Sequence, residues 1–125
     1  MLWRYEIKML FYSINILGTE YRIFKRKKDK DNRLSNKDGF CDHHAKEIVV
    51  LKCEENKDDI DQMRNLQDYE KKILRHEIIH AFLYESGLDI NPHDIDQWAR
   101  DEEMVDWMAI QFPKMYKIFA ELDIL

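Results

Sequence analysis

Five consecutive residues carry the clearest chemistry of this chain: His76-Glu77-Ile78-Ile79-His80, which has the pattern H-E-x-x-H. Residues four apart lie on one face of an α-helix, so both imidazoles can reach one metal ion while the glutamate holds a water molecule. The neighbouring residues are apolar, as in a buried helix, and burying two imidazoles and a carboxylate without partners is costly. A bound cation satisfies all three groups at once. The pattern therefore predicts a hydrolytic metal site.

Zinc is the ion that we expect, because imidazole and carboxylate ligands suit it. Hydrolytic zinc sites use three protein ligands and leave the fourth position to water. The candidates for the third ligand are His93, Glu102 and Glu103. The metzincin continuation requires a glycine and a histidine where this chain has Leu83 and Ser86, so that subclass is excluded.

A second helical pattern follows the H-E-x-x-H segment and makes Glu102 the preferred third ligand. Glu102 shares one helix face with Val105, Ala109 and Phe112, so we expect it to head a stripe that faces the core. Asp106 lies one turn further on, where it can accept a hydrogen bond from the far N–H of a zinc-bound histidine.

Glu103 is the weaker candidate, because it belongs to a neighbouring face with Trp107 and Ile110. The presence of both glutamates can also be explained without a metal. The helix dipole favours acidic residues in the first turn of any helix.

The H-E-x-x-H helix is predicted to start near Asp68, whose carboxylate can cap free N–H groups, and to stop near Gly87. Apolar residues occupy nearly every face between these ends, so we expect the helix to be central and buried. His76, Glu77 and His80 are then buried as well.

A small β-sheet is predicted before this helix. Partial alternation at 14–17 and 21–24 predicts one or two strands. Residues 39–42 read as a turn into another strand, and the apolar run at 47–52 is that strand. The charged segment 25–38 reads as an exposed loop, and its start, Lys25-Arg26-Lys27-Lys28, as solvated rather than bound to an acidic partner. Segment 54–67 reads as a polar connection. The expected fold class is α+β, with a small mixed β-sheet packed on a central helix.

The 125 residues are enough for a single domain, 1–125, and 45% are hydrophobic, so a core can form. A net charge of −5 gives no sign of a general nucleic-acid surface. Cys41 and Cys53 match no thiolate metal site or redox pair, and two reduced thiols fit a cytoplasmic protein. We expect no secretion signal and no membrane span.

Helical spacing resumes after Pro113, where Met115, Ile118, Phe119 and Leu122 share one side. Core packing is the first interpretation of this stripe. The alternative is that it docks a partner or a second copy, since methionines at 104, 108 and 115 give an adaptable surface.

The order His76-Glu77-x-x-His80 followed by Glu102-x-x-x-Asp106 resembles the gluzincin arrangement. The form Glu102-x-x-Val105-Asp106-x-Met108-Ala109, with Pro113 shortly after, is similar to the ImmA/IrrE-type metallopeptidases common in phages and mobile elements. Segments 18–21, 76–88 and 102–114 further resemble small metallopeptidases encoded by phages of Gram-positive bacteria. The family's residues are altered at 105, 108 and 110–113, and we expect no helix-turn-helix domain within these 125 residues.

This resemblance implies a zincin-like fold in which a C-terminal helix carries the third ligand. It implies that His76, His80 and Glu102 ligate Zn2+, that Glu77 is the general base and that Asp106 supports a histidine. The implied activity is peptide-bond hydrolysis, by a zinc metalloendopeptidase, in a protein or peptide substrate inside the bacterial host cell.

Two alternatives remain open at this stage. SprT-like proteases, which are associated with DNA, follow H-E-x-x-H with a histidine and a tryptophan, as His93 and Trp98 do here, but Asp94 replaces their glycine. A non-catalytic zincin-like module would instead use the metal as a structural clamp. A donor to a transition-state oxyanion could be His93, Tyr84 or Tyr116.

Overall fold

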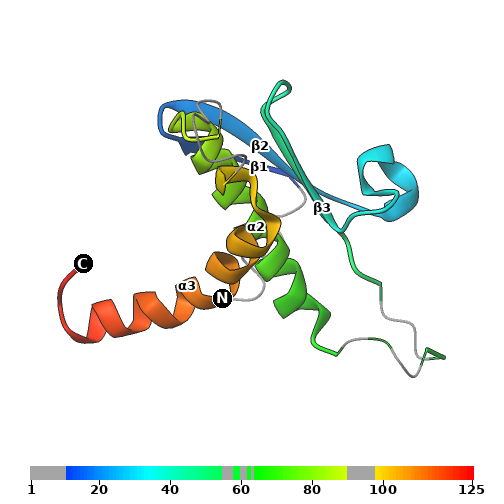
Figure 1. Ribbon diagram of the computed structural model, residues 1–125. Coiled ribbons are helices and arrows are strands. Elements are labelled where there is room, and N and C mark those ends of the chain that lie inside the picture. The colour runs from blue at the N-terminus through cyan, green and yellow to red at the C-terminus, as the bar shows by residue number, and fades with distance from the viewer. Residues whose placement is uncertain (1–10, 55–57, 60–61, 63, 90–97) are drawn as a thin grey trace.

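A four-stranded mixed β-sheet forms one layer of this computed structural model, which describes residues 11–54, 58–59, 62, 64–89 and 98–125 (Figure 1). The strands are β1 (Phe11–Ile16), β2 (Thr19–Arg26), β3 (Gly39–Asp42) and β4 (Glu47–Leu51), in the spatial order β1-β2-β4-β3. β2 runs antiparallel to β1 and parallel to β4, while β3 runs antiparallel to β4. The predicted α+β class and mixed sheet are confirmed, and residues 39–42 are a strand rather than a turn into one.

The hairpin between β1 and β2 turns on Leu17 and Gly18, which both have positive φ angles, of 51° and 95°. A two-residue loop of this kind matches the twist of the strands that it joins, and the glycine adopts its angle without strain. The amide of Gly18 also donates to the side-chain oxygen of Asn15 at 2.8 Å. Of the one or two strands predicted around Gly18, two are present, and each is longer than the predicted segment.

Helix α2 (Leu66–Glu85) carries the H-E-x-x-H segment and packs on the sheet. Asn65 caps it by accepting from the amide of Asp68, so the helix begins two residues before the predicted start. Only one stripe is fully buried, at Glu70, Ile73, Glu77 and Ala81. The expectation of a helix buried all round was wrong, because the sheet covers only one of its faces.

The hydrophobic core lies between α2 and the sheet. Its buried members are Ile16, Tyr21, Ile23, Ile48, Val50, Ile73 and Ala81. Alternate residues of β2 point toward α2, as the two-residue period of a strand requires. These core contacts therefore fix the position of α2 along the strands.

The charged segment after β2 is not the exposed loop that its composition predicted. It forms two short 3-10 turns, η1 (Lys28–Lys30) and η2 (Asn32–Leu34), and Leu34 is fully buried. Asp31, which lies between the two turns, ties η2 to the end of β2 by accepting from Arg26 and from Arg33, at 2.8 Å and 2.9 Å. Composition alone could not show that these charges pair with each other.

Helix α3 (Glu102–Glu121) follows the short turn η3 (Trp98–Arg100) and starts beside α2 (Figure 1). Asp101 caps α3 by accepting from the amide of Met104 at 2.8 Å. The helical patterns on either side of Pro113 form one continuous helix. No helix within the described ranges combines the length and the apolar character needed to cross a bilayer.

The predicted core stripe of α3 is correct only in its middle. Val105 and Ala109 are buried, whereas Phe112 is 54% exposed and the side chain of Glu102 is 73% exposed. The later stripe at Met115, Ile118, Phe119 and Leu122 is also exposed, so its interpretation as core packing was wrong. The reason is geometric, since α3 extends beyond the body that it packs on (Figure 1).

Candidate metal centre

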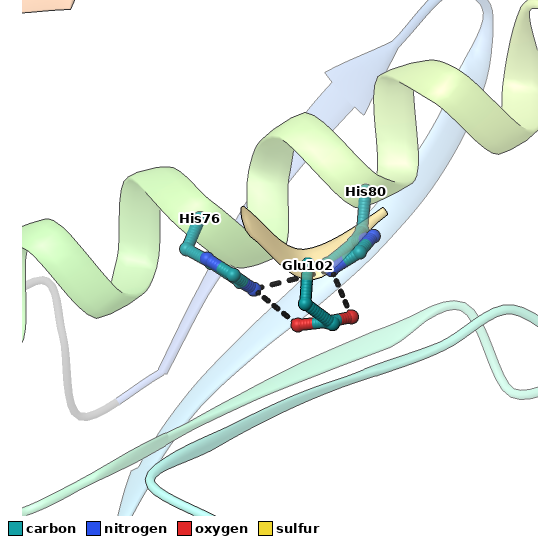
Figure 2. Close-up of side chains that lie close together, drawn as sticks. All are labelled: His76, His80 and Glu102. Carbon is teal, nitrogen blue, oxygen red and sulfur yellow. Dashed lines mark hydrogen bonds and ion pairs between the residues drawn. The ribbon is translucent and has the colours of Figure 1, made fainter. Parts of the chain in front are cut away.

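Three side chains from two helices converge at the N-terminal end of α3 (Figure 2). His76 and His80 lie one turn apart on α2, with their Nε2 atoms 3.1 Å apart. Glu102 places one carboxylate oxygen 3.0 Å from Nε2 of His76 and the other 2.9 Å from Nε2 of His80. The three groups therefore point at one common position.

This donor set fits a zinc ion. Two imidazole nitrogens and one carboxylate oxygen are ligands that zinc prefers, and tetrahedral zinc keeps its ligand atoms about 3.3 Å apart. The observed separations of 2.9, 3.0 and 3.1 Å are close to that value. Because the carboxylate of Glu102 is largely exposed, one side of the cluster faces solvent.

Asp106 lies one turn after Glu102, beside the other ring nitrogen of His76. Its Oδ1 is 3.3 Å from Nδ1 of His76 and 2.7 Å from Nζ of Lys72. The hydrogen bond from Lys72 lowers the pKa of Asp106, and the nearby His76 lowers it further. An ionised carboxylate can only accept, so Asp106 offers an acceptor for a proton on Nδ1 of His76, the arrangement that leaves Nε2 to face a metal ion.

His80 is also held in the form that binds metals. Burial lowers the pKa of His80, and the nearby His76 lowers it as well, while Glu102 acts in the opposite direction. A lowered pKa keeps the imidazole neutral near neutral pH, and only a neutral imidazole offers a lone pair to a cation.

Glu77 lies on the buried side of α2, against strand β3. A Cβ atom added to Gly39 would stand 2.8 Å from Oε2 of Glu77 and 2.6 Å from Cγ2 of Ile73, so only glycine fits there. Glu77 is 7% exposed, and no hydrogen bond or ion pair to its carboxylate occurs within the described part of the chain. Burial, and then the charge of Glu102, raise the pKa of Glu77 to about 8.

A cleft of about 730 Å³ joins these groups to the edge of the sheet. One wall is α2 with the start of α3, and the other comes from residues 37–41 at β3 and from His43 in the turn that follows. His43 stacks on Tyr84 with ring centroids 4.1 Å apart, and its Nε2 lies 3.7 Å from Asp89, which also pairs with Arg100. A group of acids, imidazoles and cations thus surrounds one open space.

The structure separates the predicted site residues into three groups. His76, Glu77, His80, Glu102 and Asp106 line the cleft, and so does Tyr84. Glu103 and Tyr116 are exposed and do not line it. His93 lies outside the described residues.

Sequence reasoning missed polar residues of the cleft that lie on α2, on η3 and in the segments that flank β3 and follow α2: Lys37, His43, Lys72, Asp89 and Arg100. No motif marks them, because they come from different elements. The one available signal that α2 approaches β3 was Gly39. A glycine at the start of a strand often allows another element to come close.

Both cysteines are free, as predicted, and both are partly buried. Burial raises the pKa of Cys41 to about 12 and that of Cys53 to about 11. Cys41 lines the cleft, with its sulfur 3.6 Å from Nδ1 of His43. Neither thiol ionises near neutral pH, so neither is suited to act as a nucleophile there.

Comparison with known proteins adds no further identification. No protein-family model, curated protein or solved structure matches this chain.

Proposed function

We propose that this chain is a zinc-dependent metallopeptidase of the zincin type, similar to the ImmA/IrrE enzymes. The observation that supports this most is the convergence of His76, His80 and Glu102 beside a buried carboxylate, Glu77, that has no hydrogen-bond or ion-pair partner among the described residues. A buried carboxylate without hydrogen bonds is costly, and a water molecule or a substrate group in the cleft would satisfy it.

The proposed roles follow from these positions. His76, His80 and Glu102 hold the metal, and Asp106 orients His76. A bound zinc ion supplies Lewis acidity, which lowers the pKa of water and polarises a peptide carbonyl. Glu77, which lines the same cleft, accepts the proton of the attacking water and returns it to the leaving amine.

We further propose that the substrate is an extended protein segment inside the bacterial cell that encodes or harbours the gene. β3 lines the cleft and ends the sheet, pairing only with β4 among the described strands. An exposed strand edge offers unpaired N–H and C=O groups, to which a peptide can add as a further strand. The cluster of Glu102 with the two histidines also favours the ImmA/IrrE-like proposal over the SprT-like alternative, in which His93 would be the third ligand.

Metal analysis of the purified protein tests the ligand set. We expect one zinc per chain in the wild type, and a loss of affinity of at least ~100-fold in His80→Ala and Glu102→Ala, because each removes one of three ligands. Glu103→Ala is the matched control, since it removes the neighbouring carboxylate, and it should bind zinc like the wild type. Equal zinc affinity in Glu102→Ala and Glu103→Ala would refute the proposed site.

Cleavage assays on an unstructured protein such as casein test the activity. Glu77→Gln should retain zinc and lose turnover by about a thousandfold or more, since it removes general-base catalysis and its proton return. Zinc bound tightly with no cleavage by the wild type would favour the alternative of a metal that acts as a structural clamp. Cleavage that survives in Glu77→Gln would contradict the assigned base.

A further inference from the structure

From Met108 to the residue that caps its C-terminus, α3 carries a long apolar stripe that the body of the molecule leaves exposed. Met108, Phe112, Met115, Phe119 and Leu122 form this stripe, which we call the seam. Their exposed fractions run from 37% at Met108 to 63% at Leu122. Figure 1 shows why, because this part of α3 extends away from the sheet and from α2.

The spacing of the seam is that of a helix-pairing surface. Its members are separated by alternating steps of four and three residues, which is the heptad pattern that keeps one face turned toward a second helix. Val105, one step earlier in the same pattern, is already buried against the body. The seam therefore continues a packing face past the point where α2 can cover it.

Charge is kept off this face. Lys114, Lys117 and Glu121 lie on the opposite side of α3, and the flanks of the seam carry Tyr116 and Ile118, which are 51% and 53% exposed. A surface that only met solvent would have no reason to gather its aromatic and aliphatic residues in this way. The partner that it fits is therefore an apolar helix face.

The area of the seam and its flanks is enough for a stable pair. Each of these side chains is about half exposed, and large side chains present about 200 Å² each, so the surface offers roughly 600–700 Å² per copy. If pairing covered all of it, two copies would bury at most about 1,300 Å², which reaches the range of specific interfaces. Single soluble chains seldom leave a continuous apolar patch of this size uncovered.

We propose that two copies of this chain pair through the seam, with their α3 helices antiparallel about a two-fold axis. In this register Phe112 meets Leu122 of the second copy, and Met115 meets Phe119, so the seam is complementary to itself. Paired helices lie about 8–10 Å apart, so parallel pairing would force the two bodies together at one end. Antiparallel pairing places the bodies at opposite ends. This proposal does not depend on zinc binding or on catalysis.

Sedimentation equilibrium of the full chain tests the pairing. The expected result is twice the 15.3 kDa chain mass at micromolar concentrations, and Phe119→Glu should weaken the pair by roughly 100-fold or more. Lys117→Glu is the matched control on the opposite face of α3, and it should leave the mass unchanged. Both positions are on the exposed part of the helix, so the folded body, checked by circular dichroism, is kept.

Three outcomes would overturn the proposal. The first is a monomer at every concentration up to about 200 µM, far above a micromolar dissociation constant. The second is a dimer that persists in Phe119→Glu. The third is a small-angle scattering profile without two separated lobes, which antiparallel pairing requires. Zinc content, measured in parallel, tests the proposed metal site independently of the pairing.

Discussion

The guanidinium Nε of Arg75 donates a hydrogen bond of 2.6 Å to the backbone carbonyl of Ala109. In an uninterrupted helix this carbonyl would accept from the amide four residues later, but that residue is Pro113, which has no N–H. Arg75 thus satisfies the one acceptor that the proline leaves open. The contact joins the two helices of the candidate site. Arg75 precedes His76 on α2, and Ala109 lies on α3, the helix that carries Glu102.

Removing this contact should show that Arg75 compensates for the amide that Pro113 lacks. Arg75→Met is expected to lower the free energy of unfolding by about 1.5–3 kcal/mol, because a buried carbonyl loses a charged donor. In a Pro113→Ala background the same change should cost clearly less, since the restored amide supplies the carbonyl. Urea unfolding of the four proteins gives the coupling, and additive effects would show that the proline and the arginine are independent.

The stability of the metal-free protein should depend on pH through Glu77. The folded-state pKa of about 8 lies above the ordinary value of 4.5, so the folded state binds the proton more tightly than the unfolded state does. Stability is therefore present below about pH 4.5 and is lost as pH rises toward 8 and beyond.

Glu77→Gln removes this titration and serves as the reference. Relative to it, the wild type in a chelator should lose about 3–5 kcal/mol between pH 5 and pH 9, at 1.4 kcal/mol per pKa unit. Urea unfolding at several pH values measures the difference between the two proteins. A difference that does not change with pH would mean that the carboxylate is not buried as described.

Asp106 should tune metal binding without being a ligand. Asp106→Ala is expected to weaken zinc binding by about 10–100-fold, because His76 loses the acceptor that fixes its tautomer. Lys72→Met is the control, since it removes the other partner of Asp106 and leaves the contact to His76 in place. Competition with a coloured chelator measures both affinities, and a larger loss in Lys72→Met than in Asp106→Ala would refute this role.

A substitution at Gly39 should impair the proposed base, Glu77, and leave the proposed metal ligands intact. Gly39→Ala forces the new methyl group against Ile73 and Glu77, at a cost of about 1–3 kcal/mol in stability. Zinc binding should survive, because the ligands lie on other residues, while peptide cleavage should fall as Glu77 is displaced. The cost should shrink in an Ile73→Ala background, and an undiminished cost there would argue against the close approach.

A buried ion pair also holds the second turn of α2 to the sheet. Nζ of Lys25 lies 2.9 Å from Glu70, with side chains 4% and 5% exposed, and Glu70 also accepts from the amide of Cys53. Glu70→Ala should cost about 3–5 kcal/mol, because it removes the carboxylate that pairs with a buried ammonium group. Glu54→Ala, which breaks the exposed pair with Lys27, should cause no measurable change in thermal unfolding. Equal effects would contradict the burial of Lys25.

Local patterns in the sequence predicted much of this molecule. The four-residue separation of His76 and His80 places them on one helix face whatever the rest of the chain does. The hairpin around Gly18 and the end of α2 near Gly87 also follow from local backbone preferences. Asp106 was predicted for the same reason, since it lies one turn beyond Glu102.

Only the tertiary structure decided which distant groups meet. The crossing of α2 and α3 brings Glu102, and not Glu103, to the imidazoles, and the approach of α2 to β3 buries Glu77 against Gly39. The same crossing leaves the seam of α3 uncovered, although its spacing alone reads as core. Periodicity reports which residues share a face, whereas packing between elements determines what that face meets.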